Sequence, residues 1–197
     1  MNYDELFEKD FREGREEEVL TNRSAKRFDV AFDLIRGLKV DDALDIGCAD
    51  GLFTESLQGL ARNVFGIDVS ETALRMASER FPSGWFSVGN IIELPFSDSR
   101  FDLVSCLDII YYLDEAGRKK AVEELARVLK PGGWLLISTS WPRFTKTRTG
   151  QPYIKPKELL RLLGHRFAFE KEATTSTLLN LGFMRSGVAM LLRSERD

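Results

Sequence analysis

A glycine turn and an acid stand where a nucleoside could bind. Gly47 and Gly51 bracket a short turn after the apolar run 43–46, and Asp68 ends the next apolar run, about twenty residues further on. A glycine turn between a strand and a helix lets a ligand approach the backbone, and an acid ending the next strand can accept both ribose hydroxyls. The spacing therefore predicts a ligand that contains a nucleoside.

The chemistry of this turn separates two kinds of nucleoside cofactor. A dinucleotide needs the pattern G-x-G-x-x-G, so that its pyrophosphate reaches the helix N-terminus. Here the turn is Gly47-x-x-x-Gly51, with Asp50 inside it, and an acid there would repel phosphate. We therefore expect a cofactor with ribose and adenine, without phosphate, and with an amino-acid end whose ammonium favours acidic and carbonyl neighbours. S-adenosylmethionine meets this description.

A second group of polar residues follows the apolar run 101–107. Asp108, Tyr111 and Tyr112 come directly after it, and ligands of open α/β sheets bind at the carboxyl ends of strands. Methyl transfer needs an aligned acceptor and, in some reactions, removal of its proton. Asp108 is thus the candidate base, with helix capping or positioning as the alternative. The two tyrosines would shape the pocket or offer ring faces to the sulfonium, unless they belong to the core.

The elements that must position these residues alternate along the chain. Apolar runs predict strands at 43–46, 64–67, 85–88, 101–107, 134–138, 167–171 and 188–193. Helical spacing predicts helices at 24–37, 52–60, 72–80, 116–129 and 156–163, the third capped by Ser70 and the fourth stopped by the Pro-Gly-Gly run 131–133. Alternating strands and helices imply a parallel sheet. We expect an α/β fold with a doubly wound, mostly parallel, seven-stranded Rossmann-like sheet and N-terminal helices.

Length and composition fit a single domain. The 197 residues, 43% of them hydrophobic, suffice for one core. We divide the chain into an N-terminal helical cap (1–37), a cofactor-binding core (40–140) and a substrate-side loop with closing strands (141–197). The net charge of −3 creates no field that would attract nucleic acid or anionic lipid. Because no apolar run could act as a signal or span a bilayer, we expect a cytoplasmic protein without membrane contact.

Other reactive residues are expected to be structural. Cys48 and Cys106 lie in apolar segments, where small buried thiols are usual, so we expect neither a disulfide nor a metal site. Asp102 opens a strand at the end away from the ligand, and His165 follows a helix, where a surface histidine is common. The basic stretch 141–166 is interpreted as a solvated face or, alternatively, as a binding surface for a carboxylate or phosphate of the acceptor.

The motifs around these residues resemble those of a known family. LDIGCADG (44–51) looks like the first motif of the class I S-adenosylmethionine-dependent methyltransferases, GIDVS (66–70) like their ribose-binding strand, and GNIIELPFSDSRFDLV (89–104) like their adenine-side segment. LKPGGWLLIS (129–138) is similar to the same family. The stretches CADG…FT and DIIYYL are most similar to the nodulation-type methyltransferases, which N-methylate chito-oligosaccharides. The resemblance covers about 40–140 closely and the remainder loosely.

The resemblance implies roles for individual residues. Asp45 and the turn would hold the methionine end, Asp68 the ribose, and Leu107 would lie beside the methionine portion. Val69 and Ile91 would flank the adenine, and Asn90 would contact it. The turn residues implied in cofactor binding are Gly47, Cys48, Ala49 and Gly51. Two of these residues depart from the family pattern, because Ala49 replaces the usual middle glycine and Asn90 a frequent aspartate.

The sequence thus predicts an enzyme that methylates an O or N atom of a small molecule or sugar and releases S-adenosylhomocysteine, and the basic stretch 141–166 allows an anionic acceptor. The alternatives are methylation of RNA or protein, and binding of the cofactor without chemistry. Nucleic acid is the less favoured partner because the sequence has no appended binding module and no basic face interleaved with aromatic residues. The protein is expected to be a monomer or a homodimer.

Overall fold

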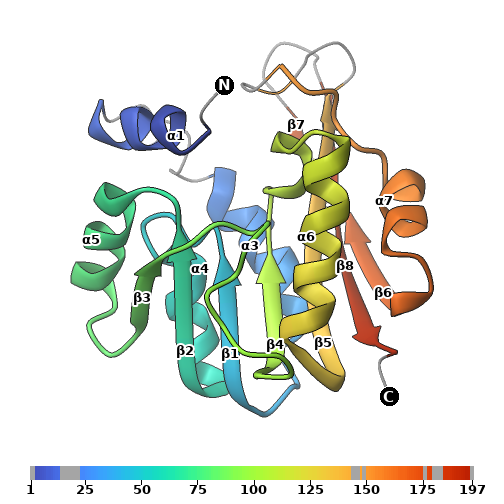
Figure 1. The fold of residues 1–197 in the computed structure, drawn as a ribbon, viewed down its shortest axis with the longest axis horizontal. Helices are drawn as coiled ribbons and strands as arrows, with labels where there is room; N and C mark the ends of the chain where they lie inside the picture. Colours follow the sequence, from blue (N-terminus) through green and yellow to red (C-terminus); the bar gives the residue numbers. More distant parts are fainter. Residues whose placement is uncertain are drawn as a thin grey trace.

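The strands form one mixed sheet. The computed structural model describes residues 3–13, 23–142, 147, 150–174, 177–178 and 184–195. The strand order is β3-β2-β1-β4-β5-β8-β6, with β7 paired to β8 (Figure 1). The strands are β1 Val40–Ile46, β2 Ala61–Asp68, β3 Trp85–Val88, β4 Phe101–Cys106, β5 Leu129–Pro142, β6 Phe167–Thr174, β7 Thr177–Leu178 and β8 Met184–Ser194.

The direction of the strands confirms the predicted fold class. Strand β1 pairs in parallel with β2 and β4, β2 with β3, and β4 with β5. Strand β8 runs antiparallel to β5, β6 and β7 and so provides the departure from a parallel sheet. The carboxyl ends of β1, β2 and β4 therefore meet at one edge, which we call the ligand edge.

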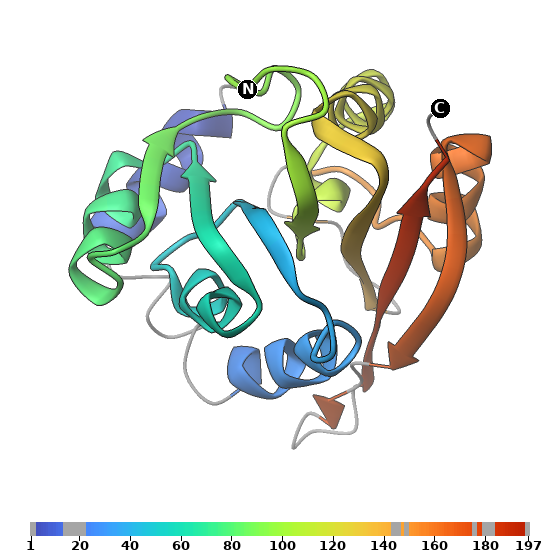
Figure 2. The same cartoon turned by 90° about the horizontal axis from the view of Figure 1, so that it is seen from below.

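Helices cover both faces of the sheet (Figures 1 and 2). One face carries α3 (Arg23–Asp33), α4 (Leu52–Ser56) and α5 (Glu71–Arg80), and the other carries α6 (Glu115–Val128) and α7 (Pro156–Leu163). Helix α1 (Tyr3–Arg12) lies at the ligand edge, beside α5. Short 3-10 helices occupy Leu57–Gly59, Ile110–Tyr112 and Gly164–Arg166.

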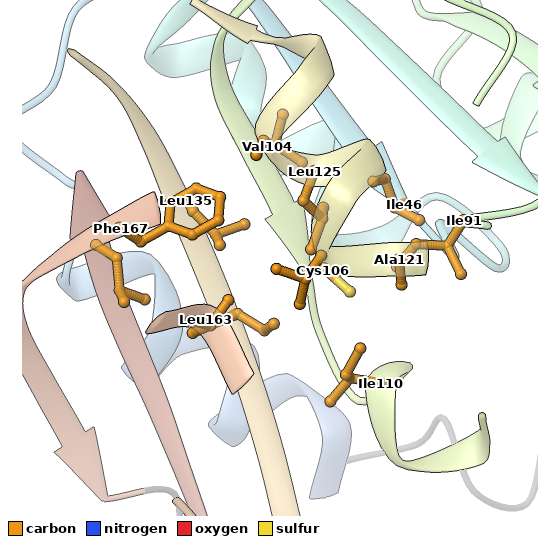
Figure 3. Packing of buried hydrophobic residues seen from close by; sticks show 14 of the residues in the cluster. Ile46, Ile91, Val104, Cys106, Ile110, Ala121, Leu125, Leu135, Leu163 and Phe167 are labelled. Atoms are coloured by element: carbon orange, nitrogen blue, oxygen red, sulfur yellow. The ribbon is translucent and has the colours of Figure 1, made fainter. Parts of the chain in front are cut away.

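Two apolar layers enclose the sheet. In the layer under α6 and α7, Leu125 and Leu163 pack against Val104 and Leu135 of the central strands (Figure 3). On the opposite face, buried Ile35 and Phe53 belong to a second cluster with strand residues. The central strands are apolar on both sides because both sides are covered, as parallel strands require. This double cover makes the ligand edge the exposed end of a rigid sheet.

The structure corrects three predicted boundaries. The Pro-Gly-Gly run 131–133 lies inside β5 and does not stop α6, which already ends at Val128 because Leu129 adopts extended backbone angles. A register shift between Phe101 and Leu103 accommodates the run. The predicted helix 52–60 is shorter and continues as a 3-10 turn, and α3 ends at Asp33 and not at 37. Of the predicted N-terminal helical cap (1–37), residues 1–2 and 14–22 lie outside the described part of the chain.

Arg127 fastens the segment between β3 and β4 to α6. Its guanidinium donates to the carbonyls of Leu94 and Phe96 at 3.0 and 2.6 Å, and forms ion pairs with Glu124 and Asp98 at 2.7 and 2.9 Å. The Glu124 carboxylate in turn accepts the Leu94 N–H. A charged group that satisfies two part-buried carbonyls and a part-buried carboxylate contributes more than a surface ion pair.

We predict that Arg127→Ala lowers the free energy of unfolding by about 2 kcal/mol, because two carbonyls lose a charged donor. Urea denaturation would measure it. Lys119→Ala on the same helix is the matched control, since Lys119 and its partner Glu115 are 63% and 84% exposed, and we expect a change below about 0.5 kcal/mol there. Equal effects of the two substitutions would contradict an anchoring role for Arg127.

Candidate active site

The glycine turn after β1 has the backbone geometry that its residues predict. Gly47, Ala49 and Gly51 have φ angles of 70°, 49° and 80°, in the left-handed region. A Cβ on Gly51 would lie 3.0 Å from Cβ of Ala77 in α5, and one on Gly47 would lie 2.7 Å from Cγ1 of Ile109. Both glycines are therefore required for close packing. Ala49 is a strained replacement for a glycine, since left-handed angles cost L residues about 1 kcal/mol.

Asp68 joins the end of β2 to this turn. Its Oδ2 accepts the Ala49 N–H and its Oδ1 the Ser70 N–H, both at 3.0 Å, and the residue is 8% exposed. Ser70 caps α5 as predicted, with its hydroxyl accepting from the Ala73 N–H at 3.1 Å. A carboxylate has about four lone-pair sites. Two of these sites take the N–H groups that tie the end of β2 to the turn and to the start of α5.

Asp45 is a buried acid beneath the turn. Thr54 Oγ1 donates to its Oδ2 and Ser105 Oγ to its Oδ1, each at 2.7 Å. Burial raises the pKa of Asp45 to about 6, because desolvation outweighs these hydrogen bonds, and the charge of Asp68 adds to the effect. The site therefore holds a carboxylate that is ionised at neutral pH at a cost in stability, which favours a positively charged ligand group.

Two adjoining hollows open near the turn. The first is lined by Asp45, the turn residues Gly47 to Asp50, Phe28, Leu52, Phe53 and Leu107. The second is lined by Arg27, Phe28, Ala31, Leu107, Asp108, Ser138 and Ala189. Because Phe28 and Leu107 border both, the hollows are neighbours across these two side chains. This arrangement provides one compartment with acids and open backbone and a second compartment with polar side chains.

Asp108 lies in the second hollow and is ion-paired. Its Oδ2 is 2.7 Å from Nη1 of Arg27 in α3, and its Oδ1 accepts from Ser138 Oγ and Ser140 Oγ, both at 3.2 Å. Its own N–H donates to Ser138 Oγ at 2.9 Å, and its φ angle is 60°. The sequence analysis missed Arg27 and both serines, since nothing local links them to Asp108.

The two tyrosines after Asp108 differ in position. Tyr111 is buried against Tyr153, with ring centroids 4.9 Å apart, and burial raises its pKa well above the usual value. This packing corresponds to the core alternative for Tyr111. Tyr112 is partly buried and meets Phe7 of α1 edge to face at 5.0 Å. Of the pair, Tyr112 is therefore the one that faces the helix at the ligand edge.

Helix α1 is attached to the ligand edge by Glu8. Its carboxylate accepts from Ser70 Oγ at 2.6 Å and from Thr72 Oγ1 at 2.7 Å, at the N-terminus of α5. The hydrogen bond from Ser70 is the main reason that the pKa of Glu8 falls to about 2. No feature of the sequence separates Glu8 from the other acids of the opening segment, so it could not have been chosen there.

The segment after β3 passes close to Asp68. The Gly89 N–H donates to the Asp68 carbonyl at 3.0 Å, which brings Asn90 and Ile91 beside the end of β2. Asn90 Oδ1 accepts the Ile92 N–H at 3.2 Å, and Ile91 is buried. Val69 directly follows Asp68 and is partly buried. The three residues predicted on the adenine side thus come from neighbouring strand ends.

Of the other residues considered in the sequence, Cys48 and Asp50 line the first hollow, whereas Cys106 and His165 line neither hollow. Cys48 and Cys106 are free and buried, and burial raises the pKa of both thiols. Asp50 pairs with Arg80 at 2.7 Å, so its charge is directed toward α5 and is less available to repel phosphate than the sequence suggested. His165 and Arg166 are exposed at the edge opposite the ligand edge, where Arg166 O accepts from Glu195 N. Of the basic stretch 141–166, residues 143–146 and 148–149 lie outside the described part.

In the part of the chain that the structure describes, no group of three or more His, Cys, Asp and Glu side chains is placed to hold a metal ion. None of the helices described is long and apolar enough to cross a membrane.

The strand order and the helices on both faces define the Rossmann-like class of fold, and comparison with known proteins shows which family the chain resembles. Residues 44–137 match the model of the methyltransferase domain. A probable S-adenosylmethionine-dependent methyltransferase of Mycobacterium tuberculosis is 30% identical over 155 residues, 79% of this chain and 53% of the relative. A ubiquinone biosynthesis O-methyltransferase of Thiobacillus denitrificans is 33% identical over 103 residues, 49% of this chain and 43% of the relative.

Among solved structures, the N-methyltransferase NodS of Bradyrhizobium japonicum, in complex with S-adenosylhomocysteine, has a TM-score of 0.79 at 21% identity, covering 90% of this chain and 91% of that one. This likeness concerns the fold. Residues 44–137, just under half of this chain, are thus similar to the methyltransferase domain family, and the chain has the class I methyltransferase fold. These similarities agree with the predicted methyltransferase class, and the relative from Mycobacterium tuberculosis is named for its dependence on S-adenosylmethionine. The chain spans about half of the length of the curated relatives named here.

We predict that Asp45→Asn stabilises the ligand-free protein at pH 7, on the order of 2 kcal/mol. The raised pKa means that ionisation of Asp45 opposes folding, and Thr54 and Ser105 can turn their hydroxyls to accept from an amide. The gain should be full above pH 6, where the carboxylate is charged, and shrink as the pH falls toward 4, where a protonated Asp45 resembles Asn.

Urea unfolding of both proteins between pH 4 and 7.5 would measure this difference. A difference in unfolding free energy that grows as the pH falls would contradict the assignment of Asp45 as a buried, destabilising charge.

Proposed function

We propose that this protein transfers the methyl group of S-adenosylmethionine to an O or N atom of a small molecule or sugar and releases S-adenosylhomocysteine. The observation that carries the proposal is the juxtaposition of Asp68 and the Gly47–Gly51 turn at the ligand edge, bordered by a hollow that contains Asp45. The similarity of residues 44–137 to the methyltransferase domain family supports it.

The residues of the ligand edge, in the first hollow and beside it, fit this cofactor. Asp68 would accept the ribose hydroxyls, and Val69 and Ile91 would flank the adenine, with Asn90 at its edge. Asp45 and the carbonyls of the turn would face the positively charged amino group, which compensates the buried carboxylate. The methionine carboxylate needs a cation, and Arg27 supplies a guanidinium in the adjoining hollow. When bound, the cofactor supplies a methyl group activated by a sulfonium.

The second hollow suits the acceptor. Asp108, Ser138 and Ser140 line or border it with a carboxylate and two hydroxyls, which can orient an acceptor hydroxyl or amine. In the displacement, the acceptor atom forms a bond to the methyl carbon while the carbon–sulfur bond breaks and its electron pair stays on sulfur. Asp108 would take the acceptor proton. Tyr112 would shape the space toward α1, whereas buried Tyr111 supports it from the core.

Two kinds of relative support a small acceptor. The ubiquinone biosynthesis O-methyltransferase is named for an O-methylation and NodS for an N-methylation. Both reactions need an aligned nucleophile more than a dedicated catalytic apparatus, and the polar second hollow provides such alignment. Incubating the protein with S-adenosylmethionine labelled in the methyl group and a fractionated metabolite extract tests this part. Label confined to RNA or protein would overturn the small-molecule acceptor, and label that never leaves the cofactor would overturn the transfer.

We predict that S-adenosylhomocysteine binds with micromolar affinity and that Asp68→Ala weakens this binding by about 10- to 100-fold, because a charged acceptor of the ribose hydrogen bonds is lost. Isothermal titration calorimetry measures both values.

Asp102→Ala is the matched control for this substitution. Asp102 also accepts two backbone N–H groups, those of Asp41 and Asp42, but at the opposite edge of the sheet, where it pairs with Lys130 at 2.8 Å. It should cost stability without changing the affinity. If both substitutions weakened binding alike, loss of backbone anchoring and not of ribose recognition would explain the result for Asp68.

A further inference from the structure

The ion pair between Arg27 and Asp108 lies where the two hollows meet. Arg27 Nη1 is 2.7 Å from Asp108 Oδ2, and the two side chains are 18% and 21% exposed. Both residues line the second hollow, whose border with the first hollow is formed by Phe28, the neighbour of Arg27, and Leu107, the neighbour of Asp108. The pair therefore connects the compartment proposed for the cofactor with that proposed for the acceptor.

Asp108 remains well held without Arg27. Ser138 and Ser140 both donate to its Oδ1, and its N–H is bound to Ser138. These serines belong to β5, in the rigid sheet, and both are buried. Arg27, by contrast, extends from α3, outside the sheet. A long side chain on a surrounding helix can thus change partner while the carboxylate keeps two hydroxyl donors.

We propose that Asp108 and the carboxylate of the cofactor compete for Arg27, so that cofactor binding releases Asp108 toward the acceptor. This inference rests on the proposed function and adds an order of events to it. In the free protein, Arg27 occupies Oδ2 of Asp108, the oxygen that the serines do not contact. When Arg27 turns to the cofactor, one ion pair replaces another, and Oδ2 becomes available to an acceptor hydroxyl or amine.

The exchange has a physical consequence for substrate order. Before the exchange, the guanidinium neutralises Asp108 and fills the carboxylate oxygen that an acceptor would use. After it, Asp108 presents an unpaired negative charge beside the compartment that holds the sulfonium, which is favourable in a site of low dielectric constant. The acceptor is therefore bound productively only after the cofactor, and the protein does not present its candidate base to an acceptor alone.

Binding measurements with two ligands test the exchange. S-adenosylhomocysteine carries the amino-acid end, whereas 5′-methylthioadenosine shares the nucleoside and sulfur but lacks the carboxylate. Asp108→Asn removes the competing charge, so it should tighten S-adenosylhomocysteine binding by about 3- to 10-fold and leave methylthioadenosine within about twofold. Arg27→Ala should weaken S-adenosylhomocysteine binding by about 10-fold or more and again spare methylthioadenosine. Combined with Arg27→Ala, Asp108→Asn should have no further effect.

Asp33→Asn is the control for loss of one acidic charge near α3, because Asp33, the last residue of α3, is exposed and pairs with Arg36 in the turn that follows. It should change neither affinity. The exchange is overturned if Asp108→Asn leaves S-adenosylhomocysteine affinity unchanged or weakens it, or if it shifts both ligands equally. Failure of the proposed function looks different, since the wild-type protein would then bind neither ligand. Arg27→Lys, which keeps the charge, should recover part of the affinity lost in Arg27→Ala and so distinguishes lost recognition from a folding defect.

Discussion

The parallel pairing of β1 with both β2 and β4 is the constraint on which the rest of this molecule depends. Residue by residue, Ile46 lies opposite Ile67 on one side and Cys106 on the other, so the three strands end at the same level. The turn after β1, the acid after β2 and the acid after β4 are therefore neighbours although they are distant in sequence. The hydrogen bond from Ala49 N–H to Asp68 closes this arrangement.

Much of this arrangement could be predicted from the sequence, because the features that produce it are local. Apolar runs with period and length typical of buried strands located β1 to β4, and Ser70 marked the beginning of α5 as its cap. The glycine spacing identified the ligand edge, since backbone angles at Gly47 and Gly51 are a property of the turn itself.

Prediction from the sequence failed where an element boundary or a side-chain contact depends on a partner that is distant along the chain. The Pro-Gly-Gly run enters β5 because β4 offers a shifted register beside it, which no local pattern reveals. Likewise, the partners of Asp108 come from α3 and β5, and Glu8 finds its partners at the start of α5. Tyr111 and Tyr112 are adjacent and chemically identical, and only the orientation of a 3-10 turn places one in the core and the other against Phe7.

The charges of the site are distributed unevenly, and this unevenness is consistent with a zwitterionic ligand. Asp50 and Asp108 each have an arginine at 2.7 Å, whereas two hydroxyl groups are the hydrogen-bond donors to the Asp45 carboxylate in the described part of the chain. A buried carboxylate without a cation lowers the free energy of unfolding. Proteins retain such a destabilising charge at sites where a bound ligand compensates it. The nearby guanidinium of Arg27 provides the opposite charge. Asp45 can therefore pair with the ammonium of such a ligand. Arg27 can pair with its carboxylate, because Asp108, the present partner of Arg27, also accepts hydrogen bonds from two serines.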